Sequence, residues 1–328
     1  MEFSTIWVIA QSSLTKTLRA GMMDSKPKKK EKSEKEKKGT AMHYRIISDS
    51  SSNLFTLPGV DYTTVPMKVI AGTKEYVDTP SLNVAGMVHD LKHHHGTSGS
   101  SCANIGDWLE TFEGADVIFC VTISKNVSGS YNAAQQALTE HLEENPGKRG
   151  YVFDSLAAGP EQAMLVEKVA QLIGEGCDFD TIVEKARDYH NHTHTMYRLQ
   201  SLTNLARNGR ISAASAKLAG VLGIRVVGDV KGGRLSLLGK VRGDRKAIPY
   251  VVEEMKHRGF YDGALLRIAH CYAENIAGEL RDAILREFPN ARVMIEPTGA
   301  LCSFYAEEGG LMIGFEGGFD HENDNRLF

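Results

Sequence analysis

Unbroken apolar runs occur at three places in the first half of the chain. "HYRIISDS" begins at His43, "ADVIFCVTIS" at Ala115 and "GYVFDS" at Gly150. The last two lead through small residues into helical patterns, "NVSGSYNAAQQAL" and "LAAGPEQAMLVEKVAQLIGEG". Continuous rather than alternating apolar strands indicate that both faces of a sheet are covered. The pattern therefore predicts a parallel sheet with helices on each side, starting at His43.

Between the first two strands, residues 61–78 alternate in polarity and contain Gly72, which predicts a hairpin. Residues 81–112 predict two short helices around a hydroxyl-rich turn, "GTSGSS". Beyond Thr181 helices are interspersed with alternating strands, and Gly232-Gly233 reads as a hairpin turn. Alternating strands with glycine turns indicate a second, more antiparallel half.

The expected fold class is α/β with two domains. Residues 43–195 would form a domain with a parallel sheet flanked by helices, and residues 196–328 a second α/β domain with a more antiparallel sheet. Residues 1–42 are a Lys/Glu-rich extension. Its segment 26–38 has no apolar face to offset the ordering entropy, so we expect disorder.

Composition limits the function classes. The net charge is −3, and residues 1–38 carry a surplus of about five positive charges, which leaves the remainder near −8. The body therefore gives no sign of nucleic-acid binding. Residues 3–10 are too short to span a membrane and show no features of a secretion signal. The five cysteines are odd in number and widely spaced, which suits a cytoplasmic protein and argues against zinc.

The helix that follows the strand ending near Ser124 opens with Ser128-Gly129-Ser130. One serine there could simply cap the helix. Two hydroxyls around a glycine at the mouth of a parallel sheet also favour an anion, because the helix N-terminus is partly positive and glycine lets backbone N–H groups approach closely. Nucleophilic catalysis is the weaker alternative, since no G-x-S-x-G motif is present. A carboxylate or phosphate is the expected ligand.

Two further features bear on this anion site. Asp49-Ser50 and Asp154-Ser155 follow apolar strands, at the edge where open α/β sheets bind their ligands. Arg210, in "LARNGRIS", precedes a predicted helix, and its guanidinium group is permanently charged and can donate several hydrogen bonds to an anion. Alone, such an arginine would more often form a structural ion pair. The histidine groups at 93–95 and 190–194 lack partners at ligand spacing, so we expect no metal site.

With these residues in view, the chain resembles the DegV family of bacterial fatty-acid-binding proteins over most of residues 43–318. Seven segments in the family's order and approximate spacing carry the resemblance: "IISDSSSNL", "VPMKVIAGTKEYVD", "TSGSSCANIGDW", "ISKNVSGSYNAA", "VFDSLAAGPEQ", "SLTNLARNGRISAASAKLAGVLGIRVV" and "GKVRGDRKAI".

The resemblance implies a carrier that holds a long-chain fatty acid in an apolar tunnel and needs no other cofactor. It presents the acid to a fatty-acid kinase, which makes acyl phosphate for phospholipid synthesis. Transient contact with a membrane surface would be compatible with this role. The resemblance places the carboxylate on Thr97 and Ser128, with Ser98 and Gly129 beside them, and gives Arg210 a part in handling the head group.

The family pattern also bears on residues that would face the kinase. Arg242 matches the arginine of the KVRG-like segment and would face the phosphate donor or partner. Tyr305 lies near the position of a His-x-Gly-Pro-Gly-like turn in the family, and "TSGSS" replaces the usual Gln-Pro. Two alternatives stay open: a phosphoryl- or acyl-transfer enzyme related to the dihydroxyacetone-kinase substrate domain, and a purely structural interaction protein.

Overall fold

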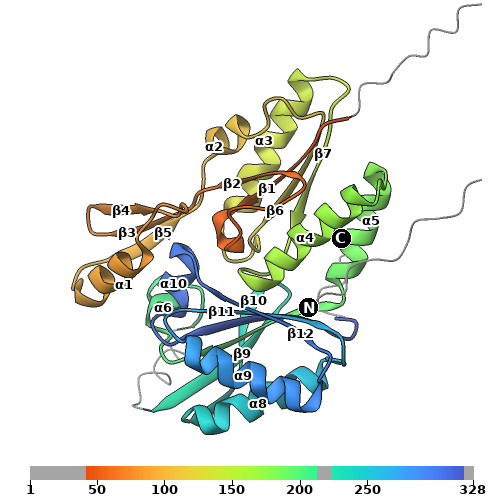
Figure 1. Ribbon diagram of the computed structural model, residues 1–328. Coiled ribbons are helices and arrows are strands. Elements are labelled where there is room, and N and C mark those ends of the chain that lie inside the picture. The colour runs from red at the N-terminus through yellow and green to blue at the C-terminus, as the bar shows by residue number, and fades with distance from the viewer. Residues whose placement is uncertain (1–41, 213–222, 321–328) are drawn as a thin grey trace, which may run out of the picture. The chain divides into compact units, whose positions relative to one another are not determined.

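The computed structural model describes residues 42–212 and 223–320 (Figure 1). The predicted disorder of the N-terminal extension and the predicted helix after Ser212 lie outside these residues. Within them, no helix is both long enough and apolar enough to cross a membrane. The elements of the first half are β1 (Tyr44–Asp49), β2 (Asp61–Val65), β3 (Lys68–Ala71), β4 (Lys74–Val77), α1 (Val84–His93), β5 (Ser98–Ser101), α2 (Ile105–Glu110), β6 (Val117–Thr122), α3 (Ser130–Glu144), β7 (Arg149–Asp154), α4 (Pro160–Gly174) and α5 (Phe179–His190).

A four-stranded parallel sheet in the order β2-β1-β6-β7 confirms the prediction for the first half. Successive residues of its central strands are buried on opposite faces. Ile118 packs with α2 and α3, whereas Phe119 packs with α4 and α5, and both are fully buried. Helices on both faces explain the unbroken apolar strands.

The segment between β1 and β6 differs from the prediction in two ways. β2 pairs parallel with β1, so the hairpin consists of β3 and β4 alone, joined at Gly72. The "GTSGSS" segment does not form a turn between helices, because Ser98–Ser101 is strand β5, paired antiparallel with β3. Hydroxyl residues are compatible with an edge strand when side-chain and ladder partners are available, and here both are.

The second half contains a six-stranded mixed sheet, which confirms its more antiparallel character. The order is β10-β9-β8-β13-β11-β12, and only β11 and β12 are parallel. Its elements are β8 (Thr193–Leu199), α6 (Thr203–Arg207), β9 (Ile224–Lys231), β10 (Arg234–Arg242), α8 (Asp244–His257), β11 (Leu265–His270), α9 (Glu274–Glu287), β12 (Arg292–Pro297), α10 (Ala300–Ala306) and β13 (Leu311–Glu316).

Helix α4 lies between the two sheets, as Figure 1 shows, while α8 and α9 cover the other face of the six-stranded sheet. A side chain at Gly314 of β13 would lie 2.6 Å from the backbone nitrogen of Glu161, so this close contact requires glycine. The predicted boundary after residue 195 falls within β8, and the division into 43–195 and 196–328 stays a prediction.

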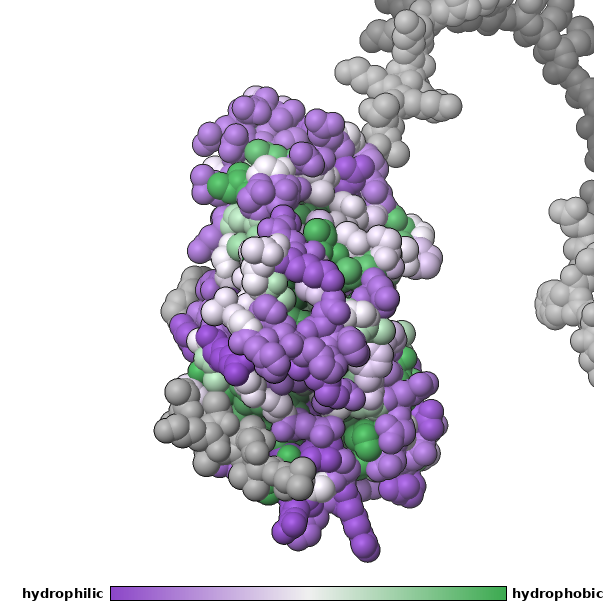
Figure 2. All heavy atoms as spheres, turned by 90° about the vertical axis from the view of Figure 1, so that its left-hand side faces the viewer, coloured by the Kyte–Doolittle hydropathy of each residue, from purple (hydrophilic) through white to green (hydrophobic). Residues whose placement is uncertain are grey.

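The surface turned toward the viewer in Figure 2 is largely hydrophilic, with small apolar groups between polar residues. Scattered apolar residues of this kind are normal for a folded protein and do not mark an interface.

Candidate functional site

A cavity of about 300 Å³ lies between the carboxyl end of the parallel sheet and the six-stranded sheet. Its walls come from β5, the loops after β6 and β7, β8, the β9–β10 hairpin, α6, α10 and β13. Most of the lining is apolar, including Met67, Leu199, Leu205, Leu301 and Met312. Its position fits the rule that open α/β sheets bind ligands beyond the carboxyl ends of their strands.

The loop after β6 is held from both sides. The Ser124 amide donates to the carbonyl of Ala157 at 2.9 Å, and the Ser124 hydroxyl donates to the carbonyl of Gly233 at 2.8 Å. Asn126 donates to the carbonyl of Gly232 at 2.8 Å. These bonds fix the backbone that leads into α3 before any ligand binds.

Ser128 and Gly129 lie at the start of α3 and line the cavity. Gly129 is the N-cap residue, and the amide of Ser130 donates to the Ser128 hydroxyl at 3.3 Å. This bond uses the hydroxyl oxygen as an acceptor, so the O–H of Ser128 stays free to donate. The Ser128 hydroxyl thus accepts from the first turn of α3, and the anion site at this helix start stays a prediction.

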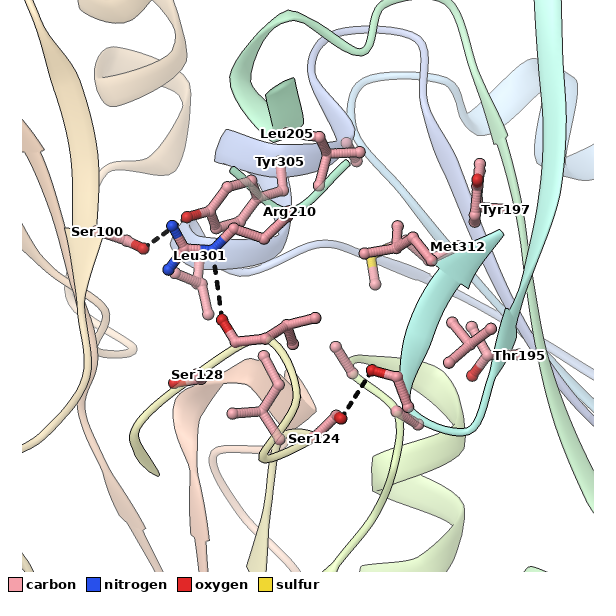
Figure 3. Close-up of a pocket in the computed structure, with 18 of the residues that line it drawn as sticks. Ser100, Ser124, Ser128, Thr195, Tyr197, Leu205, Arg210, Leu301, Tyr305 and Met312 are labelled. Carbon is pink, nitrogen blue, oxygen red and sulfur yellow. Dashed lines mark hydrogen bonds between the residues drawn. The ribbon is translucent and has the colours of Figure 1, made fainter. Parts of the chain in front are cut away.

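Arg210 reaches the same end of the cavity from the segment after α6 (Figure 3). Its Nε donates to the carbonyl of Val127 at 3.3 Å, and its guanidinium carbon lies 5.7 Å from the centroid of the Tyr305 ring. A second bond goes to the carbonyl of Asn208. Among residues 42–212 and 223–320 no carboxylate forms an ion pair with Arg210. The positive charge beside Ser128 is therefore not neutralised by the described protein.

Tyr305 of α10 completes this polar end. Its hydroxyl is 2.7 Å from that of Ser100 on β5, so the tyrosine joins two elements that lie 205 positions apart in the chain. The Sγ of Cys102, which follows β5, would be 3.4 Å from a Cβ at Gly129. β5, α10 and the start of α3 thus meet around one space.

The hydroxyls farther along the cavity already donate within the protein. Tyr197 donates to the carbonyl of Ser236 at 2.7 Å, and Thr195 donates to the buried carboxyl group of Glu161. Figure 3 places Tyr197, Thr195 and Met312 on the side away from Arg210 and Ser128. One end of the cavity therefore offers free polar donors, and the other offers mainly hydrocarbon.

Glu161 is the buried acid behind Thr195. It accepts hydrogen bonds from Thr193, at 2.7 Å, and from Thr195, and Nδ1 of His190 lies 3.6 Å from its Oε1. Burial raises the pKa of Glu161 to about 7 against the lowering effect of the two threonines, and burial lowers the pKa of His190 to about 4. Both shifts favour the neutral forms, so the two side chains are uncharged near pH 6.

Of the residues predicted for the site, Ser128, Gly129, Arg210 and Tyr305 lie together at the polar end. Thr97, Ser98 and Arg242 are not part of the cavity lining. Thr97 is exposed, and its carbonyl accepts from the amide of Gly72 at 3.0 Å. Ser98 pairs with Ala71 in the β3–β5 ladder. Arg242 is an exposed residue at the end of β10.

The sequence analysis missed Ser100 and Ser101, which line the cavity from β5. They belong to the same "TSGSS" segment, and reading it as a strand instead of a turn would have pointed to them. It also missed α10, whose pattern "ALCSFYA" is short and apolar all round. Such a segment has no polar face to distinguish it from a buried strand.

The two Asp-Ser pairs are structural. Asp49 accepts hydrogen bonds from the amide of Ile123 at 2.9 Å and from the hydroxyl of Ser130 at 2.6 Å. It also accepts from the side-chain amide of Gln162 at 3.0 Å and from the hydroxyl of Ser51. Asp154 accepts from the amides of Lys125 and Leu156. These carboxylates fix the loops around the cavity but do not line it.

The sequence model described as "Uncharacterised protein, DegV family" matches residues 43–317. A DegV domain-containing protein from Streptococcus gordonii is 37% identical over 280 residues, which cover 84% of this chain and 99% of the relative.

Two solved structures are similar over 84% of this chain and 99% of their own chains. The Streptococcus pneumoniae Fatty Acid Kinase (Fak) B3 protein, loaded with linoleic acid, is 38% identical with a TM-score of 0.82. A DegV family protein from Eubacterium eligens, loaded with heptadecanoic acid, is 36% identical with a TM-score of 0.81.

Proposed function

The chain belongs to the DegV family, and on that premise we propose that it is a carrier that binds a long-chain fatty acid in the cavity and presents it to a fatty-acid kinase. In this role the protein positions the acid and does not catalyse its phosphorylation. The similar proteins from S. pneumoniae and E. eligens, which hold linoleic and heptadecanoic acid, support this ligand class.

The observation that carries the proposal is the distribution of polarity along the cavity. Its one polar end has a guanidinium without a carboxylate partner among the described residues, a serine hydroxyl free to donate and a glycine at a helix start. A ligand with one negative head and a hydrocarbon tail matches both ends at once. Neither a sugar nor a nucleotide does, because each would place polar groups against the apolar walls.

In the proposed complex the carboxylate accepts hydrogen bonds from the Ser128 hydroxyl, the Gly129 region of the backbone and Arg210. Tyr305 and Ser100 would border it, since their hydroxyls meet at the same end of the cavity. Thr97 and Ser98 lie outside the lining, so their predicted contact with the carboxylate stays a prediction, to be tested by mutation. Burial of the tail would supply about 0.8 kcal/mol per CH2.

The kinase partnership rests on the similarity to the Fak B3 protein and on the accessibility of Arg242. In the proposal Arg242 faces the kinase or its phosphate donor, and the acyl phosphate formed serves phospholipid synthesis. This pathway places the protein in the cytoplasm, with transient contact at a membrane surface. The near-neutral charge balance gives no reason to add a nucleic-acid partner.

The alternative of a phosphoryl- or acyl-transfer enzyme on a small molecule requires a histidine at the ligand. Within the described part of the chain no histidine lines the cavity, whereas Tyr305, near the position of the family's histidine-containing turn, does. We therefore propose no catalytic residue.

Extraction of the purified protein with organic solvent, followed by mass spectrometry, tests the proposal. We expect about one long-chain fatty acid per protein, or uptake of one equivalent when delipidated protein is incubated with added acid. Absence of both would refute the carrier function. Turnover of a phosphorylated or esterified small molecule by the isolated protein would favour the enzyme instead.

A further inference from the structure

We propose that Tyr197 is a specificity-determining residue whose ring closes the apolar end of the cavity and limits the length of the acyl chain. This inference rests on the proposed function, since it assumes that a fatty acid lies in the cavity with its head at Ser128 and Arg210. Tyr197 lies on the side away from those residues, where the tail would end (Figure 3).

The position of Tyr197 in the sheet is fixed by its neighbours. On β8 it pairs with Gly228 of β9 on one side and with Met312 of β13 on the other. A Cβ built on Gly228 would lie 2.1 Å from Cζ of the Tyr197 ring. The ring therefore occupies the space that a side chain at 228 would take, and glycine is required there.

The hydroxyl group holds the ring across β9. It donates to the carbonyl of Ser236 on β10 at 2.7 Å, and the residue is only 5% exposed. Burial, with a smaller contribution from Asp229, raises the pKa of Tyr197, so the phenol keeps its proton and remains a donor. A ring that packs against the backbone at Gly228 and is held at its hydroxyl forms a rigid wall.

A second hollow lies on the far side of this wall. Its volume is about 200 Å³, and Tyr197 and Leu235 line both it and the main cavity. Its other lining residues are Leu202, Ile211, Ser212 and Leu237, three of which are apolar. Removing the ring would join the two spaces and give a longer chain room to continue, with each added methylene strengthening binding roughly fourfold while it remains buried.

The test compares wild-type protein with Tyr197→Leu and Tyr197→Phe. Delipidated samples are incubated with an equimolar mixture of saturated acids from 14 to 22 carbons, and the bound acids are measured by mass spectrometry. We expect Tyr197→Leu to raise the bound ratio of the 20-carbon to the 16-carbon acid by at least tenfold. Tyr197→Phe keeps the ring and should keep the wild-type ratio to within about twofold.

Several outcomes would overturn the inference. One is a Tyr197→Leu protein that is fully loaded with the wild-type length profile, and another is a Tyr197→Phe protein that shifts as far as the leucine variant. If Tyr197→Leu does not fold, Leu235→Ala opens the same wall between the two spaces and must give the same shift toward the 20-carbon acid. Failure of the wild type itself to take up any acid would instead refute the proposed function, so the two failures are distinct.

Discussion

The hydroxyl of Ser124 donates to the carbonyl oxygen of Gly233 at 2.8 Å, and this bond ties the loop after β6 to the turn between β9 and β10. The two residues lie 109 positions apart, in connections that leave strands of different sheets. Both also line the cavity. The contact therefore closes the cavity wall where the two halves of the fold meet.

Replacement of Gly233 by alanine tests this contact. The residue has φ = +74°, and a Cβ would lie 2.3 Å from the Ser124 hydroxyl oxygen, so the variant must strain its backbone and displace Ser124. We expect the free energy of unfolding in urea to fall by about 2–4 kcal/mol. Fatty-acid loading should fall as well.

Gly59→Ala is the matched control for that experiment. Gly59 also has a positive φ, +83°, but a Cβ there would meet no atom within 4 Å. Gly59→Ala should lower the free energy of unfolding by about 1 kcal/mol, through backbone strain alone, and should leave fatty-acid loading unchanged. Equal effects of the two substitutions would contradict a specific role for the Ser124–Gly233 contact.

Removal of the head-group donors is the second prediction. Ser128→Ala and Arg210→Met should each weaken binding of a long-chain acid roughly ten- to a hundredfold, because each removes a hydrogen bond to a charged group. Titration of delipidated protein with a fluorescent fatty acid measures the effect. Acyl-length preference should be unchanged, since these residues lie at the opposite end from Tyr197.

Thr97→Ala decides between the family-based prediction and the geometry. Direct contact of Thr97 with the carboxylate predicts a loss similar to that of Ser128→Ala. Its position outside the lining predicts binding within about twofold of the wild type. The same titration distinguishes the two results.

A pH dependence is predicted for Glu161. Its pKa in the folded protein, about 7, is above the ordinary value of 4.5, so folding favours the protonated form. The stability from this group is complete below pH 4.5 and is lost as pH rises through 7. Glu161→Gln should remove this loss, and the difference in unfolding free energy between variant and wild type should grow by roughly 3 kcal/mol from pH 4.5 to pH 8.

Measuring both proteins at each pH removes the opposite contribution of His190, whose folded-state pKa of about 4 makes stability fall as pH drops below its ordinary value of 6.5. Glu175→Gln, a substitution at the exposed C-cap residue of α4, controls for loss of one negative charge. Parallel pH curves for wild type and Glu161→Gln would show that Glu161 does not titrate in this range.

The last prediction concerns the position of α10. The buried carboxylate of Asp78 accepts from the amides of Ala300 and Leu301, at 2.7 and 3.2 Å, at the start of this helix. Asp78→Ala should lower the free energy of unfolding by about 2 kcal/mol and weaken fatty-acid binding, because α10 carries Leu301 and Tyr305 into the cavity.

Asn83→Ala provides the matched control for Asp78→Ala. Asn83 caps α1 by accepting from the amide of Gly86 at 3.0 Å, and α1 contributes no residue to the cavity. Loss of this cap should lower the free energy of unfolding by about 1 kcal/mol and leave fatty-acid binding unchanged. Reduced binding in both variants would mean that lower stability alone explains the effect.

Local sequence determined most elements of this protein and one part of the site. The unbroken strand at Val117–Thr122 indicated its burial on both faces, and Ser128-Gly129 indicated an anion at a helix start, because strand period and helix capping are encoded within a few neighbouring residues. Arg210 was recognisable by its charge, but its place beside Ser128 was not.

Only the tertiary structure decided which distant segments meet. It brings β5 and α10 together through Ser100 and Tyr305. It also makes Asp49 a hydrogen-bond acceptor within the protein instead of a ligand-binding residue, and it packs the Tyr197 ring against Gly228. Each of these depends on packing between elements separated by tens to hundreds of residues. Local propensity and hydrophobic period carry no information about such pairings, whereas side-chain volume and buried hydrogen bonds in the folded chain select them.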